Sequence, residues 1–211
     1  MKVLRIIEIV MIVLGCLCII AGLCVWGYNV WDDNRAKANA AQVTAKLEAI
    51  LNRSGRPEEV FLDENAQPLF RTYPNLDMPV AELEGETFVG ILDIPALGLE
   101  LPVYNDWSYE LMRSAPCRYS GTAYAKNLVI AAHNYRSHFG RIEALKQGDP
   151  VRFTDMTGHV FEYEVGALEI LAADDVQQMV NSPWELTLFT CTVGGQSRTT
   201  VRCRLRSGKE G

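Results

Sequence analysis

Three side chains with the chemistry of a nucleophilic enzyme stand at the ends of strand-like segments. Cys191 closes the run TLFTC directly before the flexible loop TVGGQS, and Arg198 opens the next segment seven residues later. His133 closes the apolar run NLVIAA before the polar loop NYRSH. A thiol at a strand end can be reached by a substrate and activated by an imidazole, and a guanidinium can stabilise a carbonyl oxygen that gains charge. We therefore interpret Cys191 as a nucleophile, His133 as its acid/base partner and Arg198 as an oxyanion-side cation.

Residue chemistry alone leaves alternatives to this assignment. Cys191 could be a small buried hydrophobe and Arg198 a surface charge, which is the commoner situation for such a pair. His138 competes with His133, although it lies at the start of a predicted helix, and His159 lies in a TGH turn where a solvated histidine is expected. Spacing along the chain does not give the distance between the strand ends.

Alternation along the strand that ends in TLFTC divides its side chains between two faces. Leu186, Leu188 and Thr190 are expected on one face, which sends Thr187, Phe189 and Cys191 to the other.

The cysteine count bears on which thiol reacts. Three of the six cysteines lie inside an apolar run, and the remaining three, an odd number, leave at least one thiol unpaired in an extracytoplasmic domain. Those three are Cys117, Cys191 and Cys203. Together with the three histidines they lack any recognised zinc-ligand spacing, so we expect no metal and no cofactor.

The apolar run extends from Ile9 to Val25 without a charge and is long enough for a membrane span, which needs about 20 residues. Lys2 and Arg5 precede it, and Asp32 and Asp33 follow it. The positive-inside rule then predicts a single-pass protein of the cell membrane with a cytoplasmic N-terminus and an extracytoplasmic catalytic domain.

A cleaved signal peptide is the competing interpretation of this run. No small-residue cleavage site follows it, and Trp26, Tyr28 and Trp31 suit an interfacial aromatic belt. An uncleaved anchor is therefore favoured.

Charge excludes one class of partner. The 211 residues carry a net charge of −6 with a pI near 5.2, whereas nucleic-acid binding needs a concentrated basic face. The one basic cluster, Arg198 to Arg206, alternates like one side of a strand and is best explained as a largely solvated strand face. We expect no nucleic-acid partner.

Helical and irregular segments separate the apolar run from the core. Residues Trp31 to Asn52 are rich in helix formers, with Val43, Leu47, Ile50 and Leu51 at helical spacing, and are expected to prolong the anchor helix. The stretch 56–84 holds four of the nine prolines and is expected to be a linker, or a strap across the domain.

The core begins near Thr87 and consists of short strand-like segments separated by turn residues. Two helical interruptions are expected, around residues 108–113 and 139–147, and many short strands indicate a sandwich or barrel. The expected strands are FVGILDI (88–94), LELPVY (99–104), NLVIAAH (127–133), PVRFTD (150–155), HVFEYEVGALEIL (159–171), ELTLFTC (185–191) and RTTVRCRLR (198–206).

These motifs together resemble the sortase family. TLFTC fits the TLxTC signature of sortases, VIAAH is similar to the segment that carries their histidine, and SRTTVR is similar to the segment that supplies their arginine. The runs VGILDIPALGLELPVY, YSGTA and FGRIEALKQGDPVRF match further landmarks in the family's order. The resemblance covers Thr87 to Leu205.

The resemblance implies a fold and a domain organisation. The fold is mainly β, a closed sortase-type β-barrel with short helices, preceded by an N-terminal transmembrane helix. We expect a cytoplasmic tip and anchor at residues 1–30, a juxtamembrane helix and linker at 31–86, and the catalytic barrel at 87–211.

It also implies an activity. A membrane-anchored cysteine transpeptidase of this type cleaves a C-terminal LPxTG-like sorting signal through Cys191 and transfers the acyl group to an amine, with His133 and Arg198 in the roles given above. Thr190, Ala132 and Asn134 are the expected substrate-binding neighbours. The segment 171–184 is expected to line the groove that receives the sorting signal.

The implied partners are surface proteins or pilins that carry a sorting signal, and an amine acceptor such as a cell-wall precursor. This corresponds to surface-protein anchoring of the Gram-positive type. Two alternatives stay open: a thiol hydrolase that uses water, and a binding module that keeps the barrel without turnover.

Several positions depart from the family pattern. Ala132 replaces the glycine usual before the histidine, Val193 stands where many members have proline, and Arg118 occupies a place where histidine is frequent. The loop between Cys191 and Arg198 is short for the family, so Arg202, on the same strand face, is a minor alternative for the catalytic arginine. The subtype most resembles classes B or D.

Overall fold

The computed structural model describes residues 2–54, 62–63 and 67–206. By its internal contacts the chain divides into two units, Met1–Arg35 and Ala36–Gly211. The first unit consists of the N-terminal part of one long helix, and the second contains the end of that helix together with all the strands.

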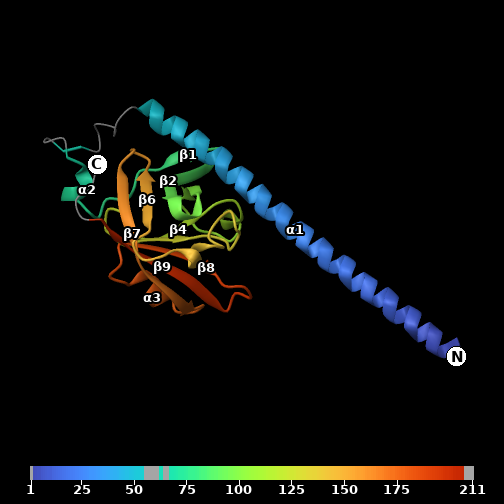
Figure 1. Cartoon of the computed structure of the whole chain (residues 1–211). Coiled ribbons are helices and arrows are strands. Elements are labelled where there is room, and N and C mark those ends of the chain that lie inside the picture. The colour runs from blue at the N-terminus through green and yellow to red at the C-terminus, as the bar shows by residue number, and fades with distance from the viewer. Residues whose placement is uncertain (1, 55–61, 64–66, 207–211) are drawn as a thin grey trace. The chain divides into compact units, whose positions relative to one another are not determined.

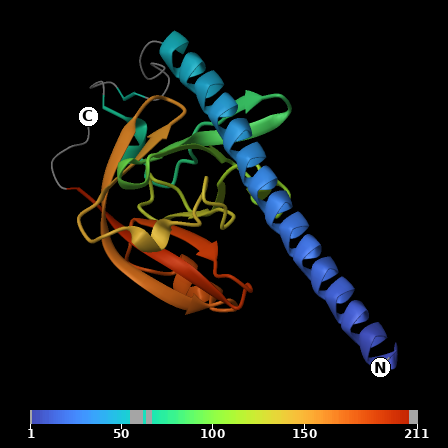
Figure 2. The ribbon, with the colours of Figure 1, turned by 45° about the vertical axis from the view of Figure 1, so that its right-hand side comes forward.

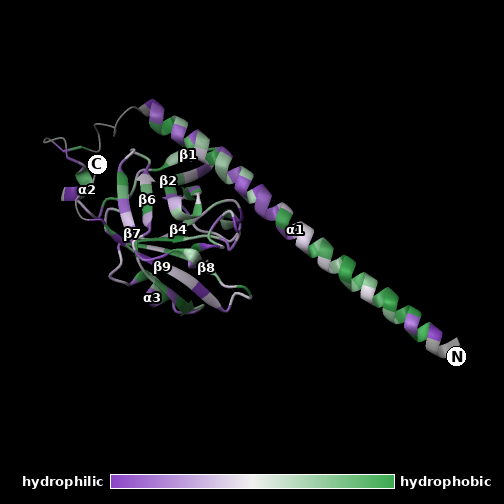
Figure 3. Cartoon of the chain, viewed as in Figure 1, coloured by the Kyte–Doolittle hydropathy of each residue, from purple (hydrophilic) through white to green (hydrophobic). Residues whose placement is uncertain are grey.

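Helix α1 runs without interruption from Lys2 to Ser54. Its N-terminal portion exposes one large apolar side chain after another, among them Ile12, Ile19 and Trp26, and Figure 3 shows this concentration of apolar residues along the helix. The helix is long and apolar enough to cross a membrane by length and composition. The expected prolongation beyond the apolar run is present, because the helix continues through Asn52.

Within the second unit, the C-terminal part of α1 packs against the outer side of the barrel. Leu47 is fully buried, and Val43, Ile50 and Leu51 are partly buried in the same cluster. Residues three and four apart on a helix share one face, which explains why these four positions are buried together. The helical spacing in the sequence correctly predicted this buried face.

Eight strands close into a barrel (Figure 1) in the order β2-β3-β4-β5-β8-β9-β7-β6, with β6 pairing back onto β2. The ninth strand, β1 (Ala81–Leu83), pairs with the start of β2. The predicted mainly β, closed-barrel fold is confirmed. The barrel strands are β2 (Glu86–Ile94), β3 (Leu99–Tyr104), β4 (Cys117–Ser120), β5 (Leu128–Ala131), β6 (Pro150–Asp155), β7 (Val160–Ala172), β8 (Leu186–Cys191) and β9 (Ser197–Leu205).

Two strand pairs are parallel, and the longest pair, β7 with β9, is antiparallel. β3 pairs with β4 and β5 pairs with β8 in parallel, whereas β7 and β9 run antiparallel, side by side over most of their length (Figure 2). A parallel pair brings the carboxyl ends of both strands to the same edge. The ends of β5 and β8 therefore lie together.

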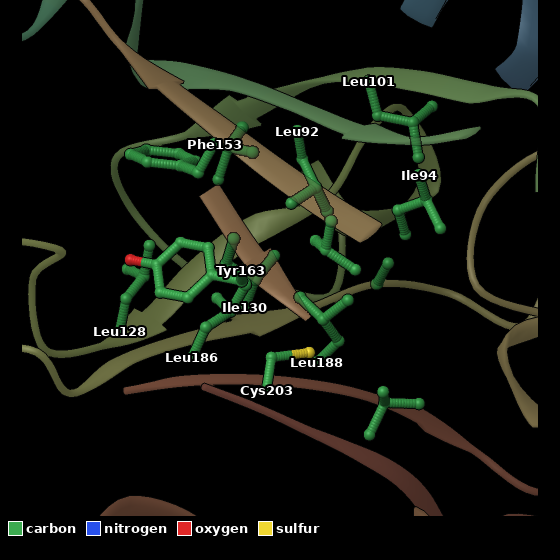
Figure 4. Close-up of a cluster of buried hydrophobic side chains, with 14 of the residues drawn as sticks. Leu92, Ile94, Leu101, Leu128, Ile130, Phe153, Tyr163, Leu186, Leu188 and Cys203 are labelled. Carbon is green, nitrogen blue, oxygen red and sulfur yellow. The ribbon is translucent and has the colours of Figure 1, made fainter. Parts of the chain in front are cut away.

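The barrel is filled by alternate side chains from its strands, as Figure 4 shows. Each strand sends every second side chain inward, so the short apolar runs seen in the sequence become one core. Fully or almost fully buried core residues include Leu92, Ile94, Leu101, Leu128, Ile130, Phe153, Tyr163, Leu186, Leu188 and Cys203.

The seven strand segments expected from the sequence are all present, with ends that differ by two residues at most. Strands β1 and β4 were missed, because three or four residues are too short to show alternation. The two expected helical interruptions are wrong in extent. They are single 3₁₀ turns, η3 (Leu111–Arg113) and η4 (Ile142–Ala144).

Three further short elements were not predicted: α2 (Leu69–Thr72), η2 (Pro95–Leu97) and α3 (Val176–Val180). Single turns of this kind have no apolar periodicity to detect, and α3 is held mainly by tertiary contacts.

Residues 67–84, part of the predicted linker or strap, pack on the barrel. The ring of Phe70 in α2 stacks on Tyr124 with centroids 4.4 Å apart and meets the ring of His159 at 4.9 Å. Met78 is buried in the main core. Residues 55–61 and 64–66 of the predicted linker lie outside the described residues.

We predict that Leu188→Ala lowers the free energy of unfolding by about 2–5 kcal/mol, because Leu188 is fully buried in the barrel and its loss leaves a cavity. Val193→Ala is the control, since Val193 is 95% exposed in the next loop and its change should stay within about 0.5 kcal/mol. Urea unfolding followed by tryptophan fluorescence measures both. Equal effects of the two substitutions would contradict the inward orientation of Leu188.

Candidate active site

The ends of β5 and β8 bring His133 and Cys191 to the same edge of the barrel. Ala131 pairs with Phe189 in the parallel register, and His133 follows Ala131 by the same two residues as Cys191 follows Phe189. The pairing continues past the end of β5, because the Ala132 amide donates to the Phe189 carbonyl at 3.1 Å.

The hairpin of β8 and β9 sets Arg198 beside Cys191. The two residues are direct partners in the antiparallel register. Gly194 and Gly195 turn the chain between them with φ of 89° and 75°, values that favour glycine. Thr192 and Ser197 close the turn through a backbone bond of 3.0 Å. The short loop is thus a tight hairpin that fixes the two strand ends against each other.

Alternation along β8 agrees with the sequence prediction. Leu186 and Leu188 belong to the barrel core, whereas Phe189 belongs to the second cluster outside it. Thr190 faces inward, 4% exposed, and its hydroxyl donates to the Ala132 carbonyl at 2.9 Å. Cys191 follows on the outer face.

A pocket of about 230 Å³ opens at this edge, and both Cys191 and Arg198 line it. One wall is aromatic, with Trp107 5.4 Å from Tyr119 and Tyr119 5.2 Å from Phe189 between ring centroids. A second part of the lining comes from the end of β7 and the segment between β7 and β8. The other lining residues are Tyr109, Met112, Ala132, Ala172, Ala173, Asp175, Val176 and Met179.

Arg198 is half-buried and is held by its own hairpin. Its Nη1 donates to the carbonyls of Gly195 at 2.9 Å and Ser197 at 3.0 Å. Among the residues that the structure describes, Nε and Nη2 of this guanidinium make no further hydrogen bond. These donors are available to a ligand in the pocket.

His133 is half-buried, and its ring is fixed by neighbours in the following loop. Its Nδ1 accepts a hydrogen bond from the Asn134 amide at 3.1 Å, and the ring of Tyr135 lies 4.3 Å away between centroids. Of the predicted binding residues, Ala132 lines the pocket, whereas Thr190 and Asn134 are not among the lining residues. Their assignment as binding residues stays a prediction.

Burial separates the three barrel thiols. Cys117 and Cys203 are fully buried, and desolvation raises the pKa of each thiol to about 12. A thiol with such a pKa is protonated and unreactive near neutral pH. Cys191 is partly exposed at the pocket, and all six cysteines are free. Cys191 is the barrel thiol that a substrate can reach.

The competing histidines are both buried. His138 is fully buried, with its ring 5.4 Å from that of Tyr135. His159 is 7% exposed and packs against Phe161 and Phe70, so the expectation of a solvated histidine in the TGH turn is wrong. The reason is Phe70, which reaches the turn from the preceding strap segment. None of the three histidines, His133 included, is among the residues that line the pocket. His133 differs from the other two because it is half-buried and follows the end of β5 beside Cys191.

Arg202, the alternative arginine, lies on the same strand face but is only 2% exposed. Its guanidinium is enclosed by protein acceptors and it does not line the pocket. Arg118, at the position where sortases frequently have histidine, instead donates to the Asn105 side chain at 2.6 Å and pairs with Asp77. That ion pair lowers the pKa of the Asp77 carboxyl.

The residues of the aromatic wall were missed by sequence reasoning. Trp107 and Tyr109 come from the β3–β4 connection and carry no motif, whereas Tyr119 of β4 is the first residue of the landmark YSGTA. An aromatic-rich connection between strands is the signal that could have indicated them. The segment 171–184 was expected to line the groove, and Val176 and Met179 within it do line the pocket.

The fold of this chain is that of sortases. It resembles sortase A from Corynebacterium diphtheriae with a TM-score of 0.52 at 18% identity, over 88% of this chain and 96% of that one. It resembles sortase E1 from Streptomyces coelicolor, solved with a tripeptide in the active site, with a TM-score of 0.52 at 22% identity, over 60% of this chain and 92% of that one.

A Clostridium perfringens sortase D5 transpeptidase is a further structural neighbour, with a TM-score of 0.51 at 18% identity over 75% of this chain and 99% of that one.

The family model for the sortase domain matches residues 92–206, more than half of the chain, so this protein belongs to the sortase family. Sortases are cysteine transpeptidases, and membership supports an enzyme that acts on peptide bonds. The neighbours span classes A, C, D and E, so the expectation of class B or D is left open. No curated protein matches the chain.

We predict that iodoacetamide at neutral pH modifies Cys191 and leaves Cys117 and Cys203 unmodified in the folded protein, because their burial and raised pKa suppress the thiolate. Tryptic mapping by mass spectrometry restricts the comparison to these three thiols. Urea-unfolded protein is the control, in which all three should react. Labelling of Cys117 or Cys203 as fast as Cys191 in the folded state would contradict the site.

Proposed function

We propose that this protein is a sortase in which Cys191, His133 and Arg198 carry out transpeptidation on a C-terminal sorting signal. One observation carries the proposal: the β5, β8 and β9 strand ends bring these three side chains to a single edge, beside a pocket that Cys191 and Arg198 line. A nucleophile, a proton carrier and a cation are the groups that acyl transfer through a thioester requires.

The first half of the reaction forms the acyl-enzyme. The Cys191 thiol gives its proton to His133, and the sulfur attacks the carbonyl carbon of the scissile peptide bond. The oxygen of the tetrahedral intermediate becomes negatively charged. The free donors of Arg198 stabilise that oxygen in a pocket partly shielded from water. The C–N bond then breaks, His133 gives its proton to the leaving amine, and a thioester on Cys191 remains.

The second half transfers the acyl group. An acceptor amine attacks the thioester carbonyl and gives up a proton to His133, the C–S bond breaks, and a new amide is released. The thiol–imidazole pair returns to its starting state. The net reaction exchanges one amide for another and needs no cofactor.

The donor and acceptor follow from the family resemblance and the anchor. We propose an LPxTG-like sorting signal as the donor, on a surface protein or pilin, and a cell-wall precursor or pilin amine as the acceptor. Helix α1 would anchor the enzyme in the cell membrane with residues 1–30 as tip and span, residues 31–86 as juxtamembrane helix and linker, and the barrel outside. The pocket's aromatic and aliphatic lining suits the apolar residues of such a peptide.

The covalent step is tested by intact mass. The full chain in detergent micelles is incubated with a library of Leu-Pro-x-Thr-Gly peptides without an acceptor amine. We expect a mass increase equal to the peptide minus its fragment from glycine onward, and no increase in Cys191→Ala. An adduct that persists in Cys191→Ala would exclude this cysteine as the nucleophile.

The roles of the partners are tested by rate. We expect His133→Ala to lower the transfer rate to triglycine by about 10²–10⁴ because general acid/base catalysis is lost. Arg198→Ala should lower it by about 10²–10³ through loss of oxyanion stabilisation. Arg206→Ala, an exposed arginine just beyond β9, is the control and should retain the wild-type rate. A wild-type rate in Arg198→Ala would remove Arg198 from the mechanism.

Transfer and hydrolysis are separated by trapping the acyl-enzyme. With triglycine or hydroxylamine present, a transpeptidase yields the peptide–amine conjugate in preference to the free acid, and chromatography with mass detection gives the ratio. A product that is free acid at every amine concentration would favour the thiol hydrolase. Peptide binding without release of the C-terminal fragment would favour the binding module.

A further inference from the structure

Arg202 is a buried cation on the outer face of β9, close to the site but not in it. Its side chain is 3% exposed, and its Nε donates to the Glu169 carboxylate of β7 at 3.0 Å. Removing a guanidinium from water is costly unless its charge and its donors are matched. In this position one carboxylate matches the charge, and further acceptors surround the remaining donors.

The remaining acceptors of the Arg202 guanidinium belong to α3, to β8 and to the segment between them. Nη2 of Arg202 donates to the Gln178 carbonyl at 2.8 Å, and Nη1 lies 3.3 Å from the Met179 carbonyl, both in the last turn of α3. Nη1 also donates to the Thr187 hydroxyl on β8 at 3.0 Å. Ser182, in the segment that leads from α3 to β8, is a further acceptor at 3.3 Å.

Helix α3 depends on such contacts because it has only five residues. A helix of that length is not stable by its own hydrogen bonds, and its last carbonyls have no partners within the helix. The same segment supplies Asp175, Val176 and Met179 to the pocket wall. Arg202 therefore stabilises a wall of the pocket without lining the pocket itself.

The hydrogen bonds of Arg202 also align this wall with the reactive groups. Thr187 and Arg202 are register partners on β8 and β9, the two strands that also carry Cys191 and Arg198 as register partners. The sulfur of Met179 in turn lies 3.9 Å from the Thr200 hydroxyl, which lies between Arg198 and Arg202 on β9. The same two strands, β8 and β9, thus position both the wall and the nucleophile.

We propose that Arg202 is a positioning residue that determines how the acyl-donor peptide fits the pocket, by clamping α3 to the strands that carry Cys191 and Arg198. This inference rests on the proposed function, since it assumes that the pocket receives the donor peptide. Arg202 itself touches neither the peptide nor the reacting atoms.

The test compares Arg202→Lys with the wild type as full chains in detergent micelles. Lysine keeps the charge but its single ammonium cannot satisfy acceptors on β7, β8 and α3 together. The probe is a Leu-Pro-Ala-Thr chloromethyl ketone, whose chloride the Cys191 sulfur displaces. We expect the inhibition constant KI to rise roughly tenfold, the equivalent of one net hydrogen bond, with the maximal inactivation rate kept within about twofold.

Two further measurements separate positioning from a general loss of structure. Iodoacetamide, too small to need the α3 wall, should alkylate Cys191 at the wild-type rate. Hydrogen exchange should accelerate at the amides of Met179 and Asn181, which bond to Asp175 at 3.3 Å and Gln177 at 2.8 Å. Arg206→Met is the matched control that removes an exposed arginine near the end of the same strand, and it should change none of these values.

The outcomes are distinct. An unchanged KI with unchanged exchange in Arg202→Lys would overturn the inference, and so would an equal loss of reactivity toward both alkylating agents. A wild-type protein that reacts with iodoacetamide but not with the peptide ketone would contradict the proposed donor. In that case hydrogen exchange alone tests whether Arg202 holds α3 in place. Faster exchange in Arg202→Lys supports this role, and unchanged exchange overturns it.

Discussion

Strand β8 is hydrogen-bonded on both sides, in parallel to β5 and antiparallel to β9, and the position of every reactive group depends on this pairing. A shift of one residue in either register would turn Cys191 inward and away from its partners. The register is specified by burial, since Leu186 and Leu188 must face the core for the barrel to be filled. The geometry of the site is therefore a consequence of the packing of the barrel.

Residues of the same type have different roles in this barrel, depending on where they lie. Cys203 is part of the packed core, Cys117 is buried in the cluster outside it, and Cys191 is exposed at the pocket where its strand ends. Arginine shows the same division, because Arg198 keeps donors free at the pocket whereas Arg202 has its guanidinium enclosed by acceptors. Position in the fold determines which member of each pair can act on a ligand.

The sequence was sufficient for features that depend on local periodicity. Alternation in TLFTC predicted the outward face of Phe189 and Cys191, and helical spacing predicted the buried face around Leu47. It could not separate Arg198 from Arg202, since residues four apart on a strand share a face and only the placement of α3 over one of them distinguishes the two. It also failed for His159, because the residue that buries it, Phe70, is far away in the chain.

The isolation of Cys191 among the thiols of the barrel has a further consequence for its chemistry under oxidising conditions. A cysteine oxidised to the sulfenic acid is rescued when a neighbouring thiol condenses with it to a disulfide. Cys117 and Cys203 are enclosed and protonated, so neither can serve as that resolving thiol. Recovery of an oxidised Cys191 within the barrel then depends on a reductant that enters the pocket from outside, and without one oxidation proceeds to the irreversible sulfinic and sulfonic acids.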